Sequence, residues 1–211
     1  MTCIFSASCA TSSYNHLLLE HGASLPGLCR QQLQAFRFEE DAHRYLLGKL
    51  LLIKGMAWMG YTDTDLSGLK YTPFNKPYFD NNIHFNISHS GNYVLCAISD
   101  TSAVGIDLEE IKDNNHQDLV HCFTGNEWYC INSAAKPTEV FYRFWTRKEA
   151  IIKADGRGLH IPLLSFEVIQ DCVTIDSNKW HIQELAIDRE YQAHFVSDDS
   201  VQGNYSFIEL L

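Results

Sequence analysis

The sequence has few positive charges: lysine and arginine sum to 16 against 26 aspartates and glutamates, for a net charge of −10. Binding to DNA, RNA or an anionic membrane surface needs a basic footprint. The charge balance therefore argues against nucleic acid or membrane as a partner and leaves room only for a local basic pocket. Long apolar runs are also missing, because runs such as residues 50–53 are far below the roughly 20 residues of a membrane span.

The seven cysteines are scattered, and none forms a Cys-x-x-Cys pair. This spacing excludes a zinc knuckle and a thioredoxin-like motif. The sequence also lacks a P-loop, a Gly-x-Gly-x-x-Gly motif and a Gly-x-Ser-x-Gly nucleophile elbow. No lysine or arginine precedes Arg30, so no signal peptide is expected. Together these absences predict a cytoplasmic protein with reduced cysteines.

Apolar residues are numerous enough for a sizeable core, since 45% of the 211 residues are hydrophobic and 12% are aromatic. Helical spacing of these residues predicts one helix over 36–59. A second helix is expected to start after an N-cap at Thr138 and to end at Gly156. Residues 112–137 are expected to be mainly helical, whereas 1–35 show no clear pattern. Strands are expected at 83–87, 93–98, 103–108, 166–169, 172–175, 180–187, 191–196 and 204–208. Without regular alternation of strands and helices, the prediction is an α+β fold.

Two nine-residue segments, 40–48 and 148–156, share an acid, an alanine and a glycine at matching offsets. Each lies in an expected helix that strands follow. This internal similarity indicates two similar halves that meet near residue 102. The predicted domains are residues 1–102 and 103–211.

Asp107 and Glu109 are the first candidate functional pair. On a strand, residues two apart point to the same face, while Ile106 and Leu108 face a core. Two hard oxygen ligands side by side suit Mg²⁺. The alternative is a strand end that exposes its acids to water.

Glu149 and Lys153 are four residues apart on the second long helix. They form either a plain helical ion pair or an acid beside a phosphate-neutralising cation. Ser88 and His89 lie in a turn whose hydroxyls and backbone N–H groups either bind a phosphate or form an ordinary polar turn. Glu127, at an expected helix start, either stabilises the helix dipole or acts as a base.

With these residues in hand, the sequence resembles the long, Sfp-type 4′-phosphopantetheinyl transferases. The matching stretches occur in family order between residues 36 and 166. They are Glu40-Asp41-Ala42-His43-Arg44, Asn75-Lys76-Pro77, Phe85-Asn86-Ile87-Ser88-His89-Ser90-Gly91, Gly105-Ile106-Asp107-Leu108-Glu109, and Trp145 with Lys148-Glu149-Ala150 and Lys153. Their order makes the resemblance specific.

The resemblance implies transfer of the phosphopantetheine arm of coenzyme A to a serine of an apo carrier protein, with release of adenosine 3′,5′-bisphosphate. It implies carrier proteins or domains of fatty acid, polyketide or non-ribosomal peptide synthesis as partners. It also implies a monomer with two similar α+β halves and an active site in the cleft between them. Coenzyme A would be the co-substrate and Mg²⁺ the metal, with Mn²⁺ as a substitute.

The resemblance also assigns roles to residues of this chain. Asp107, Glu109 and Glu149 would hold the metal against the coenzyme A pyrophosphate. Glu127, with or without Glu149, would help to deprotonate the carrier serine, and Lys153 would neutralise phosphate charge. Coenzyme A contacts are expected from Arg44, Lys76, Ser88, His89, Asp107 and Lys153.

Two rival functions differ in class from a transferase. A metal nuclease would also use an Asp, a Glu and a Lys, but such sites place Glu-x-Lys on one strand, and the acidic net charge disfavours it. A catalytically inactive module that binds coenzyme A or a carrier would not need all four of Asp107, Glu109, Glu149 and Lys153.

Overall fold

The computed structural model describes residues 1–62, 64–113, 116–199 and 205–209. Its first sheet has the order β10 (Tyr205–Glu209), β1 (Thr2–Ser8), β5 (Tyr93–Ser99) and β4 (His84–Ser90). β1 runs parallel to β10 and antiparallel to β5, which pairs in turn with antiparallel β4. Three helices accompany this sheet: α1 (Tyr14–His21), α2 (Gly27–Ala35) and α3 (Glu39–Trp58). A short pair, β2 (Lys70–Tyr71) and β3 (Pro77–Tyr78), follows α3.

The second sheet is antiparallel, with the order β6 (Val104–Glu110), β9 (Tyr191–Ser197), β8 (Asn178–Glu184) and β7 (Cys172–Ile175). Its helices are α4 (Gly125–Ser133) and α5 (Pro137–Asp155), and α5 packs on β6 and β9. Short 3₁₀ helices lie at Gly22–Ser24, His116–Cys122, Gly158–His160 and Leu163–Ser165. The predicted α+β class is therefore confirmed.

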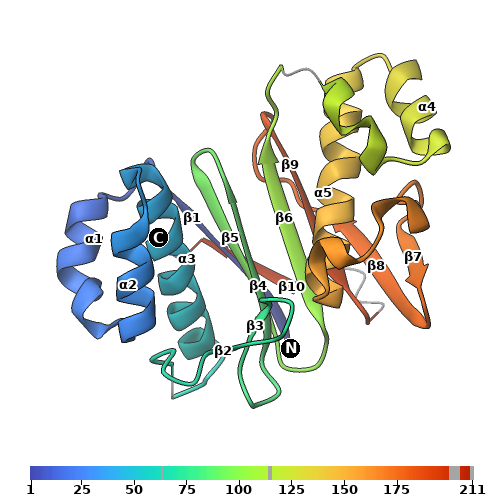
Figure 1. The fold of residues 1–211 in the computed structure, drawn as a ribbon. Helices are drawn as coiled ribbons and strands as arrows, with labels where there is room; N and C mark the ends of the chain where they lie inside the picture. Colours follow the sequence, from blue (N-terminus) through green and yellow to red (C-terminus); the bar gives the residue numbers. More distant parts are fainter. Residues whose placement is uncertain (63, 114–115, 200–204, 210–211) are drawn as a thin grey trace.

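The two sheets face each other, and the helices lie outside them (Figure 1). Alternation along the strands produces this layering, because neighbouring side chains point to opposite faces. In β5, Val94, Cys96 and Ile98 pack toward α3, whereas Leu95 and Ala97 join the core between the sheets. β6 and β9 contribute to that middle core from the other side. A third core lies between α5 and the second sheet.

β1 is one of the elements that the sequence pattern missed, together with α1 and α2. All seven of its residues are buried, so both faces are covered and no apolar–polar alternation marks the strand. Its polar members are the small residues Thr2, Ser6 and Ser8, and Thr2 is hydrogen-bonded to Ser99 at 2.9 Å. A strand that is buried on both faces and contains small polar residues gives no periodic signal.

Two further expectations were wrong in detail. Thr138 is not the N-cap of α5: the cap is Lys136, and Pro137 is the first helical residue, a position that suits proline because its missing N–H has no partner there. No strand forms at 166–169, where the N–H of Val168 donates instead to the side chain of Glu127 at 2.9 Å. Gly156 does end α5, with a left-handed φ of 94°.

Other expected elements are present with shifted ends. Residues 114–115, within the expected helical segment 112–137, and residue 204, at the start of the expected last strand, lie outside the described residues. That last strand, β10, pairs with β1 of the first sheet. Two similar halves that meet near residue 102 stay a prediction. Among the described residues, no helix combines the length and apolar character needed to cross a bilayer.

Candidate functional site

The candidate site begins with β6, whose side chains alternate as predicted. Ile106 and Leu108 are fully buried between the sheets. Asp107 and Glu109 therefore point to the opposite face, toward α5. Gly105 on that face allows the helix to approach closely, because an added Cβ would lie 2.1 Å from the carbonyl oxygen of Ala150. This close approach brings the α5 side chains against the strand carboxylates.

A cleft of about 310 Å³ collects six of the predicted site residues. It is lined by Ile87, Ser88, His89, Asp107, Glu109, Trp145, Glu149 and Lys153. These residues come from β4, β6 and α5, so the cleft lies where the two sheets and the second long helix meet. Trp145 is half-buried and lines the cleft.

Asp107 is the centre of the charge network in this cleft. It is 2% exposed, and its Oδ1 accepts hydrogen bonds from Ser88 Oγ at 2.9 Å and from Lys153 Nζ. The ion pair raises the pKa of Lys153, because Asp107 and the nearby Glu149 and Glu109 outweigh the lowering effect of burial. Asp107 Oδ2 is buried and has no hydrogen-bond partner among the described residues. A buried carboxylate oxygen without a partner is costly unless a ligand satisfies it.

Glu109 and Glu149 share the cleft with Asp107 and respond to its charge. Burial and then the negative charge of Asp107 raise the pKa of each of these glutamates. Crowded carboxylates that resist ionisation together are what a cation relieves. The donor set is hard oxygen, which Mg²⁺ prefers, and Mg²⁺ commonly takes only one or two carboxylates together with water and phosphate oxygens. The chemistry of the site and the free Asp107 Oδ2 fit such an ion.

The carboxylates are not already arranged around a metal position. Among the described residues, no group of three or more His, Cys, Asp or Glu side chains is close enough together to hold a metal ion. The Lys153 ammonium group lies against Asp107 and takes up part of the room beside this carboxylate. The chain by itself thus offsets one of the three acidic charges with an internal ammonium group.

A larger cavity of about 600 Å³ adjoins the cleft and shares His89 with it. Its lining is Cys9, Glu40, Asp41, His43, Arg44, His89, Ser90, Gly91, Asn92, Glu110 and Lys112. Arg44 donates to Asp41 at 2.7 Å and to the carbonyl of Gly91 at 3.1 Å, so it holds the β4–β5 turn against α3. Burial, followed by the charges of Arg44 and Lys153, lowers the pKa of His89.

Lys76 lies apart from the carboxylates, at the C-terminal end of α5. Its Nζ donates to the carbonyl oxygen of Ala154 at 2.6 Å, and its side chain covers Gly156. Burial lowers the pKa of Lys76 to about 8. An ammonium group at a helix C-terminus interacts favourably with the free carbonyls there.

Glu127, the predicted base, also lies outside the cleft. It is fully buried and forms an ion pair at 3.0 Å with Lys148, which is also fully buried. The carboxylate accepts two further bonds, from the N–H of Thr124 at 2.8 Å and of Val168 at 2.9 Å. The first of these is part of a capping box at the start of α4. A buried, fully bonded carboxylate has no direct path to an external hydroxyl group.

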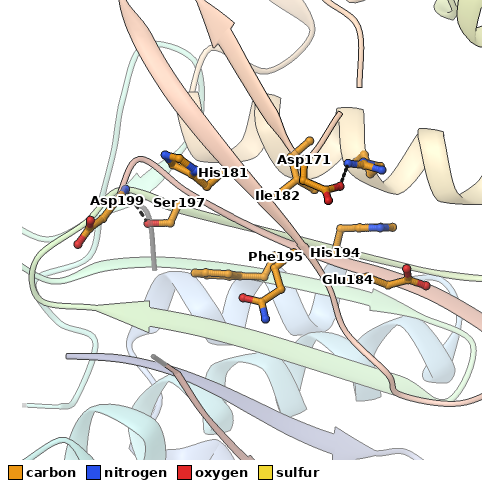
Figure 2. Close-up of a pocket in the computed structure, with 10 residues that line it drawn as sticks. Asp171, His181, Ile182, Glu184, His194, Phe195, Ser197 and Asp199 are labelled. Atoms are coloured by element: carbon orange, nitrogen blue, oxygen red, sulfur yellow. Dashed lines mark hydrogen bonds and ion pairs between the residues drawn. The ribbon is translucent and has the colours of Figure 1, made fainter. Parts of the chain in front are cut away.

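A further cavity, of about 340 Å³, lies in the second sheet and contains none of the predicted site residues (Figure 2). His194 and Glu184 are paired neighbours on β9 and β8. His194 is 1% exposed, and its Nδ1 is 2.8 Å from Thr146 Oγ1. Burial, then the charges of Arg147 and Arg143, lower the pKa of His194 to about 3. This histidine is therefore neutral at pH 7.

Two side chains missed in the sequence, Asn86 and Ser90, link the sheets beside the cleft. Asn86 accepts a hydrogen bond from the N–H of Ile106, and Ser90 donates to Glu109 at 2.8 Å. The available signal was the polar residue at every second position: Asn86, Ser88 and Ser90. Residues two apart on a strand point to the same face, so these three side chains lie on one side of β4.

Comparisons with known proteins point to one family. Residues 103–206 match the family model described as the 4′-phosphopantetheinyl transferase superfamily, and residues 14–101 match that of the 4′-phosphopantetheinyl transferase N-terminal region. The 4′-phosphopantetheinyl transferase gsp of Aneurinibacillus migulanus is 40% identical over 129 residues, which cover 60% of this chain and 54% of that protein. For the 4′-phosphopantetheinyl transferase Sfp of Bacillus subtilis (strain 168), identity is 36% over 145 residues, which cover 66% of this chain and 63% of that one.

A more distant relative matches along more of the chain. The L-aminoadipate-semialdehyde dehydrogenase-phosphopantetheinyl transferase of Rattus norvegicus is 27% identical over 197 residues, which cover 85% of this chain and 64% of the relative. The chain thus spans less than two thirds of the length of each of these relatives. The two family matches together leave out little of the sequence, and the chain belongs to the 4′-phosphopantetheinyl transferase superfamily.

Proposed function

We propose that this protein transfers the 4′-phosphopantetheine arm of coenzyme A to a serine hydroxyl of an apo carrier protein and releases adenosine 3′,5′-bisphosphate. The carrier would be a protein or domain of fatty acid, polyketide or non-ribosomal peptide synthesis. The observation that carries the proposal is the cleft in which the buried, unpartnered Oδ2 of Asp107 lies among two further carboxylates and Lys153. Family membership supports the same activity.

The reaction breaks the pyrophosphate bond of coenzyme A and forms a phosphodiester to the serine oxygen. Phosphoryl transfer depends mainly on positioning and on charge neutralisation. Asp107 and Glu109, together with Glu149, would hold Mg²⁺, or Mn²⁺ in its place. When bound, that ion would neutralise charge on the pyrophosphate and stabilise the negative charge that develops on the leaving group.

Lys153 and Glu149 have complementary roles in this proposal. The Lys153 ammonium, held against Asp107 without coenzyme A, would turn toward the phosphate oxygens and neutralise the leaving phosphate. Glu149, which lines the cleft beside Lys153, would take the serine proton directly or through water. We assign Glu127 the role of holding α5 in place through Lys148, since its carboxylate is fully buried.

The remaining predicted contacts surround this centre. Ser88 and His89 line the cleft beside Lys153 and would contact the phosphates of coenzyme A. Arg44, in the adjoining cavity, and Lys76, at the end of α5, would contact its nucleotide end. Both are held by protein partners here, so these contacts would exchange partners on binding.

The setting we propose is the cytoplasm, with the protein acting as a monomer. All seven cysteines are free, which suits a reducing compartment. The cleft is formed by strands of both sheets within one chain, so no second copy is needed to complete it.

The test is intact-mass spectrometry of an apo carrier protein incubated with this protein, coenzyme A and Mg²⁺. The expected result is the addition of one phosphopantetheine arm, lost with Asp107→Ala and lost when EDTA removes the metal. Persistence of the reaction in EDTA would exclude the metal's role. No addition on several unrelated carriers, while coenzyme A binds, would exclude the transferase activity and favour a binding module.

A further inference from the structure

β6 is joined to β4 by side chains rather than by a backbone ladder. The two strands belong to different sheets, and β6 pairs with β9 on its other side. Three polar side chains of β4 accept hydrogen bonds from three alternate N–H groups of β6. These bonds are Ile106 N to Asn86 Oδ1 at 2.9 Å, Leu108 N to Ser88 Oγ at 3.3 Å and Glu110 N to Ser90 Oγ at 3.0 Å. We call this row of three bonds the β4–β6 seam.

The seam determines where the serine protons go. A hydroxyl group has a single proton to donate. In Ser88 the proton points to Asp107 Oδ1, and in Ser90 it points to Glu109 Oε2, at 2.9 and 2.8 Å. Asn86 makes the same kind of bond to β6 but contacts neither carboxylate. Two of the three members of the seam thus hold an acid of the cleft, and one does not.

Each held carboxylate keeps one oxygen for another partner. Asp107 Oδ2 is buried and unpartnered. Glu109 Oε1 makes no hydrogen bond within the described part of the chain, since the bond to Ser90 involves Oε2 only. Partners of this kind, which orient a metal-binding carboxylate without touching the metal, commonly change metal affinity 10- to 100-fold when removed.

We infer that Ser90 is a positioning residue: its hydroxyl group, fixed by the N–H of Glu110, orients Glu109 so that its second oxygen is presented to the divalent cation. This inference rests on the proposed function for the identity of the cation. It adds a residue to the site that neither touches the metal nor belongs to the set expected to contact coenzyme A. Glu109 otherwise has a flexible side chain, and the seam removes that freedom before the ion arrives.

The test is Mn²⁺ binding, measured by the loss of the free-ion electron paramagnetic resonance signal, in three variants and the wild type. We expect Ser90→Ala to raise the Mn²⁺ dissociation constant about 10-fold. Ser90→Thr, which keeps a hydroxyl donor, should stay within about twofold of the wild type. Asn86→Ala is the matched control: it removes a bond of the seam without touching a carboxylate and should leave Mn²⁺ affinity within about twofold.

Urea unfolding of the same variants separates positioning from general loosening. Loss of hydrogen bonds, one with Asn86→Ala and two with Ser90→Ala, should lower the unfolding midpoint in both variants, but only Ser90→Ala should weaken Mn²⁺ binding. Wild-type affinity in Ser90→Ala, or equal weakening in Asn86→Ala, would overturn the inference and leave the proposed function standing. A wild type that adds the phosphopantetheine arm without binding Mn²⁺ or Mg²⁺ would overturn both the inference and the metal's role.

Discussion

Two lysines of α5, five residues apart, form ion pairs of opposite character. Lys148 and Glu127 are both fully buried, and Lys148 Nζ also donates to the carbonyls of Leu163 at 2.7 Å and Phe166 at 2.9 Å. Its three donors therefore have three acceptors. The Lys153–Asp107 pair opens into a cleft: the lysine side chain is 29% exposed, and Asp107 keeps one oxygen without a partner.

The difference separates a structural ion pair from a functional one. In the closed pair, Lys148–Glu127, every polar atom is bonded, so no group is left to bind a ligand. Removal of one partner would leave the other charge buried and unpaired. In the open pair the surplus is negative, because Glu109 and Glu149 lie beside Asp107. Such an excess favours a cation and costs stability until one binds. Each pair consists of an acid and a lysine, and only the degree of burial distinguishes the two pairs.

Breaking the closed pair should have the largest effect on stability. Lys148→Met leaves the Glu127 carboxylate buried without its cation, which should lower the free energy of unfolding by about 3–5 kcal/mol. The measurement is urea unfolding followed by tryptophan fluorescence. The double variant Lys148→Met with Glu127→Gln removes both charges and should recover most of the loss. A single variant that costs less than about 1 kcal/mol would contradict the closed-pair interpretation.

Breaking the open pair should reduce activity and spare the fold. Asp107→Asn removes the charge that holds Lys153 and would bind the metal, so carrier modification should slow at least about 100-fold. The free energy of unfolding should change by less than about 1 kcal/mol, because the Lys153 side chain is partly exposed and the substitution removes one of three crowded carboxylate charges. Rates come from intact mass over time, and unfolding comes from urea titration. A variant that unfolds as readily as Lys148→Met would remove the contrast between the two pairs.

His194 tests the charge environment on the sheet-facing side of α5. Its pKa is about 3 in the folded state, against about 6.5 when unfolded. Below pH 6.5 the histidine is therefore protonated in the unfolded chain and still neutral in the folded chain. The free energy of unfolding decreases as the pH is lowered from about 6.5 to about 3. Between pH 7 and 5 this amounts to about 2 kcal/mol.

The measurement is the free energy of unfolding at pH 7 and pH 5 in three proteins. His194→Gln should show a drop smaller than that of the wild type by about that 2 kcal/mol. His181→Gln, on the neighbouring strand β8 and only half-buried, is the matched control and should keep the wild-type drop. An unchanged drop in His194→Gln would mean that this histidine is not held neutral.

The end of α5 should give the smallest effect. Gly156 has a φ of 94°, and an added Cβ would meet the Lys76 side chain at 2.7 Å. Gly156→Ala should therefore lower the free energy of unfolding by about 1 kcal/mol, read from the thermal midpoint. Gly125→Ala is the control, because its added Cβ meets nothing within 4 Å and should change stability by less than about 0.5 kcal/mol. Equal effects in both variants would exclude strain at residue 156.

Apolar patterning was enough for several elements. The long helices α3 and α5 and the strand β4 follow from apolar spacing, β5 and β6 follow from short apolar runs, and Gly156 follows from its place after α5. β1 was missed because both its faces are buried and three of its residues are small and polar. The strand expected at 166–169 was wrong because a side chain, Glu127, takes the N–H group that a strand partner would have taken. Spacing along a chain cannot report a partner 41 residues away.

By itself, the sequence determined the side-chain chemistry and its local direction: Asp107 and Glu109 share a face because a strand repeats every two residues, and Glu149 and Lys153 share a helix face because they are four residues apart. Only the tertiary structure decided which acid and which lysine become partners. It enclosed Glu127 with Lys148, left Asp107 with a free oxygen in an open cleft, and placed the serines of β4 against the carboxylates of β6. The physical reason is that burial and hydrogen-bond satisfaction depend on segments far apart in the chain, whereas residue spacing acts within one segment.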